Sequence, residues 1–160
     1  MTTTNNTETD TIRAELKAIG LTARDVSVRF TSGGCAIRVE IKTPKANRAQ
    51  VERIAQKQSR IRYDEACGEI LAGGNLFVHV AVAPSAIESE MVVAASILDV
   101  LDVGESADLF GYEVVRTEKY GFRIYSETLR HGVTECNTAS CAARVVSELA
   151  TVGPTARDAA

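Results

Sequence analysis

The first forty residues change from a helical to a strand-like spacing of apolar positions. Ile12, Leu16 and Ile19 recur on one stripe of a helix. Thr9 or Asp10 can cap this helix and Gly20 supplies its end. Two runs follow, on either side of a Gly-containing turn, in which every second residue is apolar: Val26, Val28 and Phe30, then Cys35, Ile37, Val39 and Ile41. This pattern predicts a β-hairpin with one buried and one solvated face.

A second helix and a second pair of strands are expected before Pro84. The helix is expected over residues 47–58, where apolar positions again share one face. Residues 68–71 and 76–82 resemble strands, and Gly73-Gly74-Asn75 between them suits a turn. The first half is therefore predicted to run α-β-β-α-β-β.

The segment 86–102 is predicted to form an unusually apolar helix. Ser85 and Glu88 have the spacing of a capping box at its start. Its apolar positions cover more than half of the helix circumference, so burial on several sides is expected. The alternatives are burial between the two halves and a homodimer formed through this helix.

The rest of the second half is predicted to contain three strands and a final helix. The strands are expected over residues 112–117, 122–127 and 133–136, with turns at Gly121 and at His131-Gly132. Thr138 or Ser140 can begin the last helix. The second half thus runs α-β-β-β-α.

The predicted fold class is α+β, with two small halves whose antiparallel sheets pack against helices. The boundaries divide the chain into a disordered tail, a basic half, an acidic half and a flexible tail, over residues 1–8, 9–83, 84–151 and 152–160. The apolar helix at the joint favours one continuous core over two independent domains.

Charge is distributed unevenly between the halves. Residues 1–84 hold 12 Lys and Arg against 9 Asp and Glu, a net charge of +3, whereas residues 85–160 hold 6 against 12, a net charge of −6. Residues 24–62 alone carry ten basic and three acidic residues, which is +7. A surface that binds phosphates or an acidic partner explains this stretch. The alternative is an ordinary solvated sheet face and helix exterior.

The candidate residues for such a basic binding face are Arg29, Arg38, Lys42, Arg53 and Lys57. They belong to the polar positions of the predicted hairpin and to the second helix. A nucleic-acid-binding accessory protein that uses this face is one of the functions expected from the sequence. Such a protein binds more weakly as the salt concentration rises.

Catalytic chemistry has weaker support in the sequence. Glu69 and Asn75 are candidate binding residues of the Gly-rich loop, and an enzyme using Glu69 and Cys67 requires His79 to lie nearby. The four cysteines form no CxxC pair, which favours small buried hydrophobic residues in a reducing compartment over a zinc site. No cofactor or metal is expected, and a non-enzymatic protein is favoured.

Four stretches of the first half resemble proteins of mobile elements. Residues 12–17, 25–29 and 36–42, which include Asp25-Val26-Ser27-Val28-Arg29, look like a large polyvalent protein-associated domain of phages and conjugative elements. Residues 68–78 are similar to small phage and plasmid proteins. The resemblance covers about residues 9–82 and implies a part in establishing or protecting the element in a bacterial host.

The leading functional hypothesis is therefore a non-enzymatic interaction protein of a phage or mobile element. It would counter host defence as an anti-CRISPR or anti-restriction inhibitor, by binding a host protein or protein–nucleic-acid complex. The N-terminus has no secretory pattern and no segment is apolar enough to cross a membrane, so a cytoplasmic location in the bacterial host is expected.

Overall fold

The chain folds into two compact units, each with its own sheet and helices. The computed structural model describes residues 7–31, 35–126 and 129–157. The units are Met1–Ala83 and Pro84–Ala160, so they meet at the proline where the sequence places the joint. The small α+β fold class is confirmed. One continuous core for both units stays a prediction.

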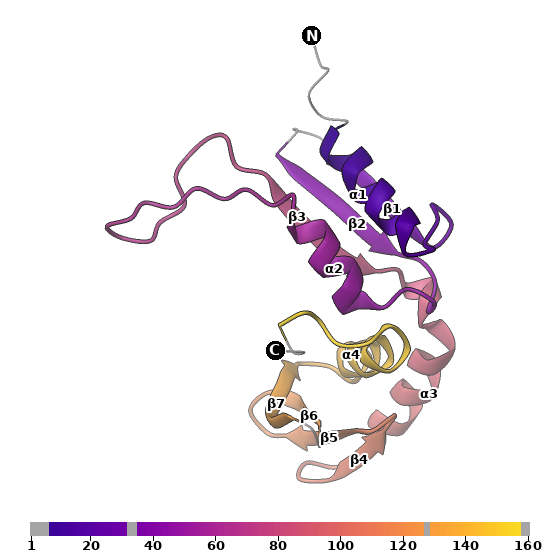
Figure 1. The fold of residues 1–160 in the computed structure, drawn as a ribbon. Helices are drawn as coiled ribbons and strands as arrows, with labels where there is room; N and C mark the ends of the chain where they lie inside the picture. Colours follow the sequence, from indigo (N-terminus) through magenta and orange to yellow (C-terminus); the bar gives the residue numbers. More distant parts are fainter. Residues whose placement is uncertain (1–6, 32–34, 127–128, 158–160) are drawn as a thin grey trace. The chain divides into compact units, whose positions relative to one another are not determined.

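The first unit is a three-stranded sheet with two helices on one face (Figure 1). Its elements are α1 (Thr7–Ala18), β1 (Val26–Phe30), β2 (Ala36–Ile41), α2 (Arg48–Gln56) and β3 (Phe77–Val82). The strand order is β1-β2-β3, in which β1 pairs antiparallel and β3 pairs parallel with β2. The expectation of antiparallel sheets is therefore wrong for β3. A parallel neighbour needs a long crossover, which α2 and the segment after it supply.

The helix ends of the first unit follow from local residues. Gly20 has a φ of +84°, and the amides of Gly20 and Leu21 donate to the carbonyls of Lys17 and Leu16, which closes α1. Asn47 caps α2 by accepting from the Gln50 amide at 3.0 Å. α1 begins at Thr7, inside the stretch predicted to be a disordered tail, and residues 1–6 of that tail lie outside the described residues.

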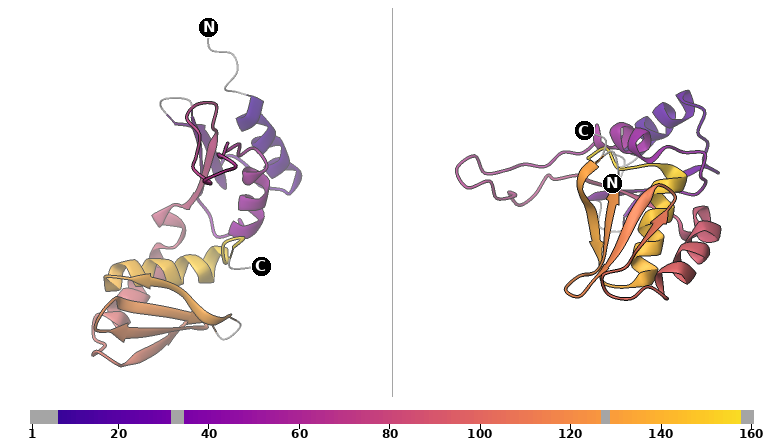
Figure 2. Two further views of the ribbon diagram at one scale, coloured as in Figure 1. Left: turned by 90° about the vertical axis from the view of Figure 1, so that its left-hand side faces the viewer. Right: turned by 90° about the horizontal axis from the view of Figure 1, so that it is seen from below.

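Burial confirms the predicted alternation in β2, but in β1 Ser27 is buried as well as Val26 and Val28, and Cys35 before β2 is exposed. Val28, Ile37 and Val39 are buried on the helix-covered face, together with Val78 of β3. The opposite face has no described helix of this unit over it, as Figures 1 and 2 show, and it carries the polar positions of the same strands.

Residues 60–76 form a two-stranded arm that projects from the sheet (Figures 1 and 2). Arg60 pairs with Leu76 at the base of the arm, Tyr63 pairs with Ile70 further out, and residues 65–67 make the turn at the tip. The predicted pairing of residues 68–71 with 76–82 is wrong. Gly73 and Gly74, with φ of +83° and +71°, interrupt the returning strand of the arm instead of reversing the chain.

The second unit is a four-stranded antiparallel meander with two helices. It contains a short 3₁₀ turn (Pro84–Ala86), α3 (Glu88–Leu98), β4 (Ser106–Leu109), β5 (Tyr112–Thr117), β6 (Gly121–Ser126), β7 (Leu129–Cys136) and α4 (Ala139–Val152). The sequence missed β4, which is only four residues long. The turn predicted at residues 131–132 is wrong, because β7 passes through both positions and Gly132 pairs with Tyr125. Residues 127–128 lie outside the described part.

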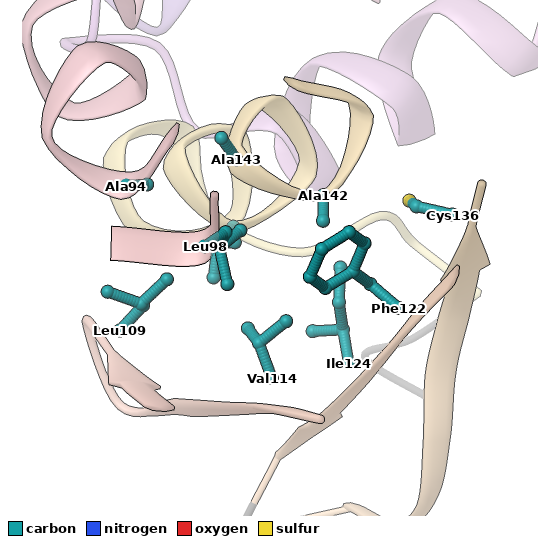
Figure 3. Packing of buried hydrophobic residues seen from close by; sticks show 10 residues of the cluster. Ala94, Leu98, Leu109, Val114, Phe122, Ile124, Cys136, Ala142 and Ala143 are labelled. Carbon is teal, nitrogen blue, oxygen red and sulfur yellow. The ribbon is translucent and has the colours of Figure 1, made fainter. Parts of the chain in front are cut away.

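The core of the second unit lies between the sheet and its helices. Phe122, Ile124 and Val114 from the strands point toward Leu98 of α3 and Ala142 of α4 (Figure 3). Small residues on α4, including Ala143, bring the two helices close together. Thr138 caps α4 by accepting from the Cys141 amide at 3.1 Å, as the sequence predicts.

The helix α3 is less buried than its composition predicts. It buries Ala94 and Leu98, whereas Val92 and Val93 are 63% and 52% exposed. The capping box is also wrong, since the 3₁₀ turn takes up Ser85 and the N-cap position falls on Ile87 without a side-chain hydrogen bond. A homodimer through residues 86–102 stays a prediction. No helix in the described part of the chain is long and apolar enough to cross a membrane.

The burial difference along α3 gives a stability test of the second unit. Leu98→Ala removes a fully buried side chain and should destabilise this unit by about 2–5 kcal/mol. Val92→Ala on the same helix should change its stability by less than about 0.5 kcal/mol. Amide hydrogen exchange in β5 and β6 measures both values, and equal effects of the two substitutions would contradict the packing described.

Candidate anion-binding surface

Three cationic or titratable side chains form a row across the open face of the first sheet. Arg29 of β1 lies directly opposite Arg38 of β2, and Arg38 lies beside His79 of β3. All three side chains are exposed. They share one face because their neighbours Val28, Val39 and Val78 alternate to the helix-covered face. We call Arg29, Arg38 and His79 the basic row.

Neighbouring acids neutralise the basic row only in part. Like charges at directly opposite positions of a sheet are destabilising. Arg38 donates to Glu40 at 3.2 Å, but no described residue pairs with Arg29. A bound anion would relieve the repulsion between the two guanidinium groups. Arginine also matches phosphate and carboxylate oxygens in a bidentate geometry.

An aromatic side chain lies beside the row. Phe77 has the same strand parity as His79 and is half-buried, next to Ala36 in the parallel register. Aromatic and guanidinium planes on an open sheet are the groups on which unpaired bases stack. The face therefore offers both charge and a stacking surface.

A cleft runs along the outer edge of β1, beside α1. Its volume is about 540 Å³, which lies in the range of ligand pockets. Val26 and Val28 line it from the helix-covered face and Ser27 and Arg29 from the open face, so it wraps around the edge of the strand. We refer to this cavity as the edge cleft.

The lining of the edge cleft is basic and apolar. Arg13, Lys17, Arg29 and Lys42 contribute four cations, and none of the described lining residues is acidic. Arg13 is held in place because it donates to the Val28 carbonyl at 2.7 Å and pairs with Asp10 at 2.7 Å. Lys42 donates to the Ala23 carbonyl at 3.3 Å. Such a cleft suits a ligand with negative charge and some apolar surface.

A hydrogen-bonded turn closes one end of the edge cleft. The Asp25 carboxylate accepts from the amide of Thr22 at 2.9 Å and from its hydroxyl at 2.8 Å. These hydrogen bonds, together with Lys45 and Thr43, hold the pKa of Asp25 below its usual value. Asp25 therefore stays ionised and orders the turn that leads into β1.

The five predicted basic-face residues fall into two groups. Arg29, Arg38 and Lys42 belong to the open-face positions of β1 and β2, or follow them directly. Arg53 and Lys57 belong to α2 and its C-cap, on the helix-covered face, and Lys57 pairs with Glu15 of α1 at 2.6 Å. The five residues that the sequence grouped into one basic face therefore lie on two different faces of the first unit.

The loop candidates belong to the arm. Asn75 accepts from the Arg62 amide at 2.8 Å and donates to the Leu71 carbonyl at 2.7 Å, so both ends of its amide hold the arm together. Glu69 and Cys67 are exposed near the tip. His79 lies in β3 instead, so the arm carries Glu69 and Cys67 away from it (Figure 1). The structure does not assemble the proposed Glu69, Cys67 and His79 site.

Only one of the four cysteines is buried. Cys35, Cys67 and Cys141 are exposed, contrary to the expectation of buried thiols, and Cys136 lies in the core of the second unit. Burial, with a contribution from Cys141, raises the pKa of Cys136 to about 12. Among the described residues, no three His, Cys, Asp or Glu side chains are grouped as metal ligands.

The sequence missed His79, Arg13 and Lys17 as members of the basic surface. Arg13 and Lys17 are four residues apart on α1, which places them on one flank of a helix. The sequence shows this spacing, but it does not show that β1 lies beside this side of α1. His79 joins the row only through the parallel pairing of β3, for which the sequence contains no local signal.

The burial of Cys136 predicts a difference in thiol reactivity. Three thiols should react rapidly with an aromatic disulfide reagent at neutral pH, and the fourth should react only when the second unit opens. Cys136→Ser should remove the slow phase of colour release, whereas Cys141→Ser should remove part of the fast phase. A slow phase that survives Cys136→Ser would contradict this assignment.

Comparison of the chain with protein-family models, with curated proteins and with solved structures found no match. The resemblance to a domain of phages and conjugative elements stays a prediction. The basic row and the edge cleft are the features on which a function can be proposed.

Proposed function

We propose that this protein is a non-catalytic binding protein whose first unit binds single-stranded nucleic acid across its open sheet face. The observation that supports this proposal is the basic row. It places Arg29 opposite Arg38 on a solvated surface, where an ordinary sheet would alternate charges. Phosphate oxygens accept hydrogen bonds from the two arginines. Phe77 and His79 provide planar groups on which bases stack.

A single strand fits this surface better than a duplex. The face is a short sheet rather than a helix or ribbon that enters a major groove. Its three strands are five or six residues long, which gives a platform about 17–20 Å along the strands. Platforms of this kind bind a few unstacked nucleotides.

Removal of the two arginines tests the proposal. Arg29→Ala with Arg38→Ala should raise Kd for a labelled single-stranded oligonucleotide at least tenfold, because a hydrogen bond to a charged group contributes about 1.5–3 kcal/mol. The slope of log K against log salt should become shallower by about 0.7 for each phosphate that the variant no longer neutralises. Fluorescence anisotropy over a salt series measures both quantities.

The control is Arg53→Ala on α2, which removes one positive charge from the other side of the unit, where the double variant removes two. It should leave the affinity and the salt slope almost unchanged. If the double variant binds as tightly as the parent chain with the same salt slope, the open face is not the binding surface. Equal reductions of affinity in all variants would indicate attraction by net charge alone.

The acidic second unit supports a second candidate function, inhibition of a host defence complex. With 6 basic and 12 acidic residues in residues 85–160, this unit has the charge of a nucleic-acid mimic. Bacteria that carry a defence system and produce the full chain should then plate a sensitive phage more efficiently. Equal plating with and without the chain, across several defence types, would count against this role.

A further inference from the structure

The edge cleft is continuous with a second cavity on the open face of the sheet. That cavity has a volume of about 300 Å³ and is lined by Ser27, Arg29, Arg38 and Glu40, and we call it the open-face hollow. Ser27 and Arg29 line the edge cleft as well. A ligand that follows the basic row from β2 to β1 therefore passes Arg29 and then enters the edge cleft.

The two cavities differ in their acidic groups. Glu40 lines the open-face hollow, where it pairs with Arg38 at 3.2 Å and so offsets one of the two arginines. Among the described residues, no acid lines the edge cleft. Asp10 and Asp25 lie outside the lining and already accept hydrogen bonds from Arg13 and Thr22. A group with more than one negative charge is therefore better accommodated in the edge cleft than beside Glu40.

The side chains of the edge cleft keep unused hydrogen-bond donors. No described residue forms an ion pair or a side-chain hydrogen bond with Lys17 or Arg29. The Lys42 ammonium uses one of its three donors on the Ala23 carbonyl. Ser27 is only 9% exposed, and no residue in the described part of the chain hydrogen-bonds its hydroxyl. Because a polar group that is buried without a partner is costly, these donors favour a bound anion in the cleft.

The charge of the edge cleft exceeds that of one internal phosphate. Arg13, Lys17, Arg29 and Lys42 line it, and of these four cations only Arg13 pairs with an acid, Asp10. An internal phosphodiester of a nucleic acid carries one negative charge, whereas a phosphate monoester carries about 1.5–2 at pH 7 and has three acceptor oxygens. The phosphorylated end of a strand therefore matches the cleft better than its interior does.

The surroundings of the edge cleft also suit the end of a strand. α1 lies beside β1 (Figure 1), and Arg13 and Lys17 line the cleft from this helix. The turn that Asp25 orders closes one end of the cleft. A strand that arrives from the open face would have to pass over α1 in order to continue, so the cleft is a place for a strand to end.

We propose that the edge cleft binds the terminal phosphate of a single strand whose interior lies on the basic row. Lys17, Arg29 and Lys42 donate to the oxygens of this phosphate, and Arg29 also lines the path of the internal phosphates. The inference rests on the function proposed for the open face and adds to it a preference for strands with a phosphorylated end. A 5′-phosphate and a 3′-phosphate offer the same chemistry, and both are included among the strands of the test.

Four forms of one oligonucleotide, labelled on an internal base, test the cleft. They carry a 5′-phosphate, a 3′-phosphate, hydroxyls at both ends, or a 5′-methyl phosphate whose end has a single negative charge. In fluorescence anisotropy, one of the two phosphorylated strands should bind the full chain about tenfold more tightly than the hydroxyl-ended strand. If that strand is the 5′-phosphate, the methyl phosphate should lose most of the preference, because it lacks the second charge.

Charge variants assign this preference to the cleft. Lys17→Ala with Lys42→Ala should make the affinities of the phosphorylated and hydroxyl-ended strands nearly equal, whereas Lys17→Arg with Lys42→Arg should keep their ratio. The matched control, Arg53→Ala with Lys57→Ala, also removes two positive charges, from α2 and its C-cap, and should keep the ratio. Arg38→Ala should weaken the binding of every strand by the same factor, because Arg38 lines the open-face hollow and not the edge cleft. Circular dichroism establishes that each variant is folded.

Three patterns of results would overturn the inference. Equal affinities of the phosphorylated and hydroxyl-ended strands, with binding that still depends on Arg29 and Arg38, would remove the terminal site and leave the proposed function standing. A preference that survives Lys17→Ala with Lys42→Ala would assign the terminal phosphate to another surface. If no strand binds the full chain, the proposed function fails and the terminal site fails with it.

Discussion

The parallel pairing of β3 with β2 is the contact on which the first unit depends. Because the two strands run in the same direction, the chain must cross from one end of the sheet to the other between them. α2 covers part of that path, and the arm extends from the remainder. The same pairing places His79 beside Arg38. The place of His79 in the basic row and the long connection that carries the arm therefore both depend on the pairing of β3 with β2.

Both helices of the first unit cover the same face of the sheet, which leaves the other face without a described layer of its own. Val28, Val39 and Val78 provide the apolar side that α1 and α2 require. The residues that alternate with them are then exposed, and arginines meet there across β1 and β2. Arg13 links α1 to the edge of β1, so the helix also shapes the cleft beside the sheet. Burial on one face and charge on the other have the same origin in strand alternation.

The second unit is organised differently. Its meander needs only short turns, and α3 and α4 pack together through small residues. Cys136 acts there as a small core residue whose thiol stays protonated. Most of the unit's charge is acidic and lies outside this core, as at the exposed Glu113 and Asp108. The two units thus differ in the sign of their net charge and in the connection of their strands.

The sequence by itself determined the helices, the first hairpin and β5, because these elements depend on local periodicity and on residues such as Gly20, Asn47 and Thr138. It also located the arginines of the open face. Only the tertiary structure decided the direction of β3, the arm in place of a strand pair, and the separation of Arg53 from Arg38. Strand alternation assigns a residue to a face, but it contains no information about which distant strand will pair beside it, or in which direction.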